Sequence, residues 1–244
     1  MDSTPWYLDW KLWSAAVAWL SFLMNITPWI KRRLKGKNLI LTTYPSLSLS
    51  HRIGITNIQW HLRIENTGGR DLDISKVFLR IGEKGEINTP LITTYEKSQA
   101  EQTLFAGVRV KPGETWQAFF CFWEMDPDVS REMRNIENAT RKELTPTPST
   151  TTLFPNQPQM STDLITKINN FFSRQFKLKP SEFPIEVRIH TNQAGEFKFS
   201  GFRFTLYESD IADLKSHTER YPSGDGITWH SNINNWIQVP VAKS

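Results

Sequence analysis

Hydrophobic and polar residues follow two different patterns along this chain of 244 residues. Residues 12–30 carry no charge, and 14 of these 19 residues are apolar. Farther along, over residues 58–64, apolar side chains alternate strictly with polar ones. An uncharged apolar stretch of this length is typical of a membrane-spanning helix, whereas strict alternation is typical of a half-buried β-strand. The patterns therefore predict an N-terminal transmembrane anchor over residues 1–37 and a β domain over residues 38–244.

The N-terminal stretch has the length and the ends of a single transmembrane helix. At 1.5 Å per residue it would span roughly 28 Å, close to the ~30 Å hydrocarbon thickness of a bilayer. Tryptophans lie near both of its ends, and their amphipathic rings prefer the headgroup level. Pro28 predicts that the helix ends within about one turn of it. The residues expected to form the anchor are Leu12, Trp13, Trp19, Leu20, Phe22, Leu23, Trp29 and Ile30.

A basic cluster follows the apolar stretch directly. Its five positive residues are Lys31, Arg32, Arg33, Lys35 and Lys37. The positive-inside bias predicts a single-pass protein of the cell membrane whose C-terminal domain is cytoplasmic. The cluster would also attract anionic headgroups, which makes membrane lipid an expected partner. Asn25 could pair with a second copy of the helix, so a homo-oligomer is expected as well.

Three other interpretations of the apolar stretch have less support. A cleaved signal peptide needs a basic start and a small-residue cleavage site, whereas Asp2 and Asp9 precede this stretch and Trp29 lies at its end. A buried core helix does not account for the aromatic ends and the abrupt basic stop. A helix lying in the plane of the membrane would need a charged face, and this segment has none.

The region after residue 38 reads as a series of short antiparallel strands. Turn signals rich in Gly, Pro and Asn separate the strands, for example at residues 66–69 and 111–114. The alternation slips by one residue at 75–76 and again at 200–201, which predicts β-bulges. About seven or eight strands with this turn spacing favour an immunoglobulin-like antiparallel β-sandwich, although the Cys…Trp…Cys pattern of immunoglobulin domains is absent.

One insertion, over residues 125–182, interrupts the strands. Its Thr-, Pro- and Ser-rich part has no periodicity and predicts an exposed, disordered loop. Residues 161–176 carry apolar residues at helical spacing, which predicts a short amphipathic helix with Ser161 as its N-cap. Residues 210–219 predict a further short helix. The tail, residues 221–244, gives no pattern from which its place can be predicted.

Composition narrows the classes of function. The net charge is +4, and Lys and Arg are spread along the chain outside the basic cluster, which does not favour binding to a nucleic acid polymer. Cys121 is the one cysteine, so no intrachain disulfide can form. Its aromatic neighbours predict a buried thiol and not a nucleophile.

Residue types that carry catalysis or bind metals occur without the spacing that those functions need. His61 and His190 fall on predicted solvent-facing positions and could meet across a sheet face. Glu124, Asp126 and Asp128 follow a predicted strand, where they could bind a cation or form a solvated turn. The chain has no phosphate-binding loop, nucleophile elbow or zinc-protease motif. We therefore expect no enzyme, no cofactor and no metal site.

These observations favour a membrane-anchored, non-catalytic module that binds a protein partner or a small ligand at the cytoplasmic face. One alternative is a nucleotide-sensing transmembrane effector of a bacterial defence system, which acts by oligomerising. Another alternative is a structural or adhesive protein that faces the envelope. A hydrolase has the least support, because no catalytic motif is found.

Overall fold

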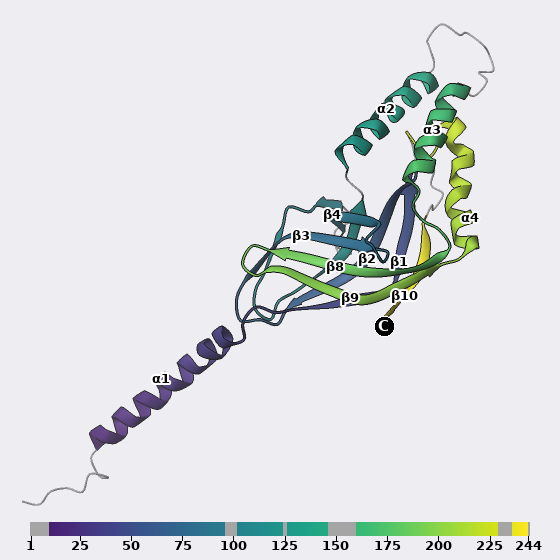
Figure 1. Ribbon diagram of the computed structural model, residues 1–244. Coiled ribbons are helices and arrows are strands. Elements are labelled where there is room, and N and C mark those ends of the chain that lie inside the picture. Colours follow the sequence, from purple (N-terminus) through teal and green to yellow (C-terminus); the bar gives the residue numbers. More distant parts are fainter. Residues whose placement is uncertain (1–9, 96–101, 124–125, 146–159, 229–235, 244) are drawn as a thin grey trace, which may run out of the picture.

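The computed structural model has three parts in a row: a helical rod, a barrel of strands, and a group of helices at the far end of the barrel (Figure 1). It describes residues 10–95, 102–123, 126–145, 160–228 and 236–243. The side chains of residues 10–12, 29 and 31–33 lie outside this description.

The described elements are five helices and ten strands. The helices are α1 (Trp10–Leu34), α2 (Pro127–Leu144), α3 (Thr162–Gln175), α4 (Glu208–Ser216) and the 3-10 helix η2 (His217–Ser223). The strands are β1 (Leu39–Arg52), β2 (Ile55–Asn66), β3 (Leu72–Ile81), β4 (Ile87–Tyr95), β5 (Gln102–Leu104), β6 (Val108–Val110), β7 (Thr115–Trp123), β8 (Ser181–Thr191), β9 (Gly195–Leu206) and β10 (Ile237–Lys243).

Eight strands close into an antiparallel barrel. Their order around the barrel is β4, β7, β2, β1, β10, β9, β8 and β3. Strand β3 then pairs back onto β4, with Phe78 opposite Pro90 and Ile81 opposite Ile87. The molecule is mainly β, but the predicted immunoglobulin-like β-sandwich is wrong, because a sandwich consists of two facing sheets and this sheet closes on itself.

The tail that could not be placed from the sequence supplies a strand of the barrel. In β10, Val239 lies opposite Leu47 of β1, and Val241 lies opposite Phe204 of β9. This strand joins the first half of the barrel to the second. Its apolar pattern is short and is interrupted by Pro240, so the sequence alone does not show which strands it pairs with.

Both predicted bulges are confirmed. The pairing of β3 with β8 shifts register between Ile74 and Lys76, and the pairing of β8 with β9 shifts between Ile185 and Val187, opposite residues 200–201. A third irregularity interrupts β1 between Thr43 and Leu47. Bulges increase the twist and the bend of a strand, and long strands need both to curl into a closed barrel.

Side chains fill the interior of the barrel. Trp60, Phe120, Phe122 and Phe204 are each less than 2% exposed, and the rings of Trp60 and Phe202 meet edge to face with their centroids 5.5 Å apart. Eight strands leave an interior just wide enough for such packing. A macromolecular partner therefore meets the outer surface, the loops or the helices.

The predicted insertion is more helical than the sequence suggested. Residues 127–144 form α2, which begins at Asp126, where the side chain accepts hydrogen bonds from the amides of Asp128 and Val129. The predicted helix at residues 161–176 is confirmed as α3, with Ser161 as its N-cap. Together with η2, these helices bury a second apolar core against the hairpin that joins β1 to β2. The predicted disordered loop at residues 146–159 lies outside the described residues.

The prediction of a single-pass transmembrane anchor is wrong. Residues 10–34 do form one helix, which continues past Pro28 to Leu34. Among the residues that the structure describes, however, no helix combines the length and the apolar character needed to cross a membrane. The reason in α1 is composition, because its serines, Asn25, Thr27 and Pro28 lower its mean hydropathy and its tryptophans do not raise it. The predicted orientation, with a cytoplasmic C-terminal domain, presupposed that span.

Candidate functional site: an exposed apolar helix

Helix α1 leaves the barrel at one end and presents its apolar side chains to solvent (Figure 1). Three alanines, four leucines and one methionine supply strong helix formers to its 25 residues. Nine large apolar side chains on α1 are 44–80% exposed, namely Trp13, Val17, Trp19, Leu20, Phe22, Leu23, Met24, Ile30 and Leu34. Burying them would release free energy on the order of 10 kcal/mol. Helix α1 could therefore bind another apolar surface with a large gain in free energy.

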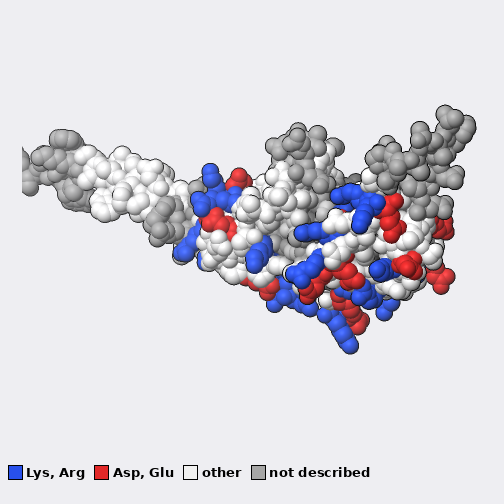
Figure 2. All heavy atoms as spheres, turned by 90° about the horizontal axis from the view of Figure 1, so that it is seen from above, with Lys and Arg blue, Asp and Glu red and all other residues white. Residues whose placement is uncertain are grey.

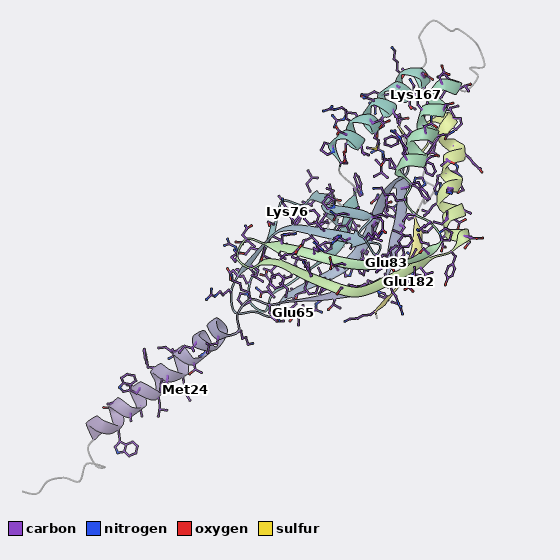
Figure 3. All side chains as sticks on the ribbon, viewed as in Figure 1. Met24, Glu65, Lys76, Glu83, Lys167 and Glu182 are labelled. Carbon is purple, nitrogen blue, oxygen red and sulfur yellow. The ribbon has the colours of Figure 1, made fainter. Side chains whose placement is uncertain are left out.

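The surface of α1 differs in kind from the surface of the barrel. Figure 2 shows the described part of α1 as an uncharged rod, while acidic and basic side chains mix over the barrel. Leu20, Leu23, Met24, Thr27 and Pro28 line an open groove on the helix. Met24 is the most exposed of the large apolar side chains between residues 13 and 30, and it lies about midway along α1, clear of the barrel (Figure 3).

Polar side chains on α1 are bonded within the helix. Asn25 donates from Nδ2 to the Ser21 carbonyl at 2.9 Å, and Thr27 donates from Oγ1 to the Leu23 carbonyl at 2.5 Å. Each bond spans one helical turn, so these groups do not require a partner from another molecule. The attraction of α1 for other surfaces therefore comes from its apolar side chains.

The connection from α1 to the barrel is short and firmly bonded. The amides of Thr67 and Gly68 donate to the Asn38 carbonyl at 3.1 and 3.2 Å, and the Gly69 amide donates to the Gly36 carbonyl at 2.8 Å. The Asn38 side chain also donates to the Thr67 hydroxyl at 2.8 Å. The segment that leads out of α1 is thus fixed to the loop between β2 and β3.

Asn66 organises the loops at this end of the barrel. It is fully buried, and its Nδ2 donates to the carbonyls of both Arg70 and Val110 at 2.8 Å. Its Oδ1 accepts from the Gly68 amide at 3.0 Å, and its carbonyl accepts from the Gly113 amide at 2.7 Å. One buried amide therefore holds the loop after β2 against the loop between β6 and β7. Sequence reasoning read residues 66–69 only as a turn.

The basic residues predicted to flank the helix lie at this connection. Residues 31–33 belong to the last turns of α1, and their side chains are outside the description. Lys35 is exposed, and the ammonium of Lys37 donates to the Gln193 carbonyl in the turn between β8 and β9. The basic residues thus belong to the stretch of chain in which α1 passes into the barrel.

The predicted anchor residues divide into two groups. Trp13, Trp19, Leu20, Phe22, Leu23 and Ile30 are all exposed on α1. The side chains of Leu12 and Trp29 lie outside the described part of the chain. The described anchor residues therefore all lie on α1, but α1 is not apolar enough over its described residues to cross a membrane.

Residues considered for chemistry lie apart from one another. His61 contacts Phe119 with the ring centroids 5.0 Å apart, whereas His190 lies on β8 with its Nε2 3.3 Å from Glu196. Asp126 caps α2, and Glu124 lies outside the described residues. Burial raises the pKa of the Cys121 thiol, as its apolar neighbours led us to expect. No group of three potential metal ligands occurs within the described residues.

His51 is an additional buried histidine that the sequence pattern did not single out. Its Nε2 lies 2.7 Å from the Leu214 carbonyl, and its Nδ1 accepts from the Gly54 amide at 3.2 Å. Burial is the main cause that lowers its pKa to about 4, and nearby His217 lowers it further. Both ring nitrogens are used, and the rings of Phe172 and Phe176 pack against the imidazole. His51 therefore holds the end of β1 against α3 and α4.

Comparison of the chain with protein-family models, curated proteins and solved structures found no match.

Proposed function

We propose that the chain is a non-catalytic binding module, in which the barrel is a rigid scaffold and α1 attaches the module to a larger apolar body. The observation that carries this proposal is the set of nine exposed apolar side chains on a helix that joins the barrel at one end only. An exposed apolar surface of this size indicates an interaction surface, because contact between apolar groups and water is unfavourable in free energy.

The barrel supports the scaffold role in two ways. Its filled interior and its hydrogen-bonded loops around Asn66 form a stiff body at the base of α1. His51, the histidine with the pKa lowered furthest, is bonded to the backbone through both ring nitrogens. It is therefore occupied in holding the helices and is not free to exchange protons with a substrate.

A fluorescent label on α1 tests this proposal. The variant carries Met24→Cys in a Cys121→Ser background, labelled with an environment-sensitive fluorophore, and neutral detergent micelles supply the apolar body. We expect the emission to shift to shorter wavelength as micelles are added. The matched control is Lys167→Cys on α3, an exposed position at the opposite end of the molecule (Figure 3), where we expect no shift. Equal shifts at both positions, or none at Met24, would contradict the proposal.

A further inference from the structure

The apolar side chains of α1 do not surround it evenly. At about 100° of rotation per residue, the nine exposed apolar side chains cover an arc of roughly 220°. Ser14, Ala18, Ser21 and Asn25 lie within about 60° of one another in the remaining arc and form one narrow stripe. By position, Trp10, Lys11, Pro28, Trp29 and Arg32 belong to the same arc near the two ends of the helix. The stripe is polar or small and carries no charge. The helix therefore has a wide apolar face and a narrow polar face.

Most of the positive charge near α1 lies at its C-terminal end, with Lys11 the one basic residue at its start. Five positive residues follow within residues 31–37, and the sequence has no acidic residue between 10 and 64. Lys35 is exposed, and Lys37 is bonded to the barrel, so the cluster stays at the junction of rod and barrel. A partner surface that complements this arrangement is apolar where it contacts α1 and anionic where it contacts residues 31–37.

We infer that the apolar body bound by α1 is the surface of an anionic lipid membrane, with the wide apolar face turned into the lipid and the stripe of Ser14, Ser21 and Asn25 turned toward water. This inference rests on the proposed attachment role of α1. Interfacial helices bury their apolar face among the acyl chains, and basic residues nearby bind anionic headgroups. This inference reverses the expectation from the sequence, which set aside a helix in the plane of the membrane because the segment has no charged face. Here the stripe of Ser14, Ser21 and Asn25 serves as the polar face in place of charged residues.

The polar bonds of α1 agree with this arrangement. Asn25 donates to the carbonyl of Ser21, so both residues of the stripe take part in one local bond on the side turned toward water. Tryptophan is suited to the interface because its ring is apolar and its N–H is polar. Trp13 and Trp19 both lie on the wide apolar face, where this preference applies.

Two labelled positions on opposite faces of α1 test the orientation. Leu23→Cys lies on the apolar face, and Ser21→Cys lies on the polar stripe about 160° away around the helix, each in the Cys121→Ser background. With vesicles that contain phosphatidylserine, we expect the label at residue 23 to shift to shorter wavelength and the label at residue 21 to remain accessible to iodide. Equal shielding of both positions would overturn the inference, because the helix would then be enclosed on all sides.

Flotation with vesicles tests the lipid class. We expect the full chain to float with vesicles of phosphatidylcholine and phosphatidylserine, and at least about tenfold less with phosphatidylcholine alone. Replacing Lys31, Arg32, Arg33 and Lys35 by glutamine should remove that preference. The matched control replaces four exposed basic residues on α2 and α3, namely Arg131, Arg134, Lys142 and Lys167, and should float as the unaltered chain does.

The other outcomes identify other occupants. Self-association of the chain without lipid, with no flotation, would identify a second copy as the partner and overturn the inference. Release by inorganic phosphate beyond that caused by chloride at equal ionic strength would identify a site for free phosphate, and would overturn it as well. A Met24 label that shifts in micelles while the chain fails to float refutes the lipid inference alone. A label that shifts in neither condition refutes the proposed attachment role.

Discussion

Gly68 and Asn38 approach each other so closely that only a glycine fits at position 68. The Gly68 amide donates to the Asn38 carbonyl at 3.2 Å, and a Cβ on Gly68 would lie 2.7 Å from the Asn38 nitrogen and 2.8 Å from the Gly36 carbonyl oxygen. These neighbours are backbone atoms and cannot rotate away. The contact ties the base of α1 to the loop between β2 and β3.

Gly68→Ala should therefore loosen the connection between α1 and the barrel. We expect a loss of about 1–3 kcal/mol in the free energy of unfolding, measured by urea denaturation, because the backbone must shift to admit the methyl group. Amide exchange at residues 36–38 should become faster. The control is Gly195→Ala, where a Cβ meets nothing within 4 Å and only the positive φ of 75° is unfavourable. Faster exchange at residues 36–38 in the control as well would show that the contact is not the cause.

Acid should weaken the packing of the helices against the barrel through His51. Its pKa is about 4 in the fold and about 6.5 in the unfolded chain, so the unfolded chain binds more protons between these values. The stability that His51 contributes is complete above pH 6.5 and falls as the pH is lowered toward 4, by at most about 3 kcal/mol. His51→Gln should flatten this part of the profile of unfolding free energy against pH. An unchanged slope between pH 6.5 and pH 4 in His51→Gln would contradict this role.

The ion pair between Arg52 and Glu137 joins the hairpin of β1 and β2 to α2. The Arg52 guanidinium lies 2.7 Å from the Glu137 carboxylate, and the Glu137 side chain is 16% exposed. Glu137→Ala should cost about 1–3 kcal/mol of stability, because Arg52 would lose its partner in a half-buried site. A double-mutant cycle with Arg52→Met measures the coupling. The exposed pair of Arg203 and Glu182 is the comparison, and its coupling should be below about 0.5 kcal/mol.

Strand β10 should be essential to the barrel although it lies at the end of the sequence. Val239 is 2% exposed and faces the core between β1 and β9. Val239→Ala should lower the free energy of unfolding by about 1–3 kcal/mol, since it leaves a cavity in a filled interior. Gln238→Ala on the outer face should change it by less than about 0.5 kcal/mol. Equal effects of the two substitutions would show that β10 does not belong to the cooperative unit.

The sequence predicted local features of the fold better than its closure. Alternation and turn signals depend on neighbouring residues, and so do the bulges at 75–76 and 200–201, which the structure confirms. Closure depends on the pairing of Leu47 with Val239, and these residues lie far apart in the chain. No local pattern distinguishes a sheet that closes from a sheet that packs on a second sheet. The sandwich prediction was wrong for this reason.

Helix α2 shows a second limit of sequence patterns. Its large apolar residues Val129, Met133, Ile136 and Leu144 share one face of the helix, at spacings of four, three and eight residues. Charged residues occupy many of the other positions, and this overall polarity hid the stripe although its spacing is helical. At the candidate site the pattern was easier to see, and the apolar residues of α1 were recognised from the sequence. The sequence did not show that Asn66 and Gly68 fix the base of this helix to the barrel.

Amide hydrogen exchange on the full chain, with and without vesicles that contain phosphatidylserine, tests the central claim most directly, because it reports which part of the molecule becomes buried. We expect slower exchange in residues 13–30 on adding vesicles, with the exchange of β8, β9 and α3 unchanged. Slower exchange on the barrel or on α3 with no change in α1, or no change anywhere, would contradict the claim that α1 attaches this module to a larger apolar body.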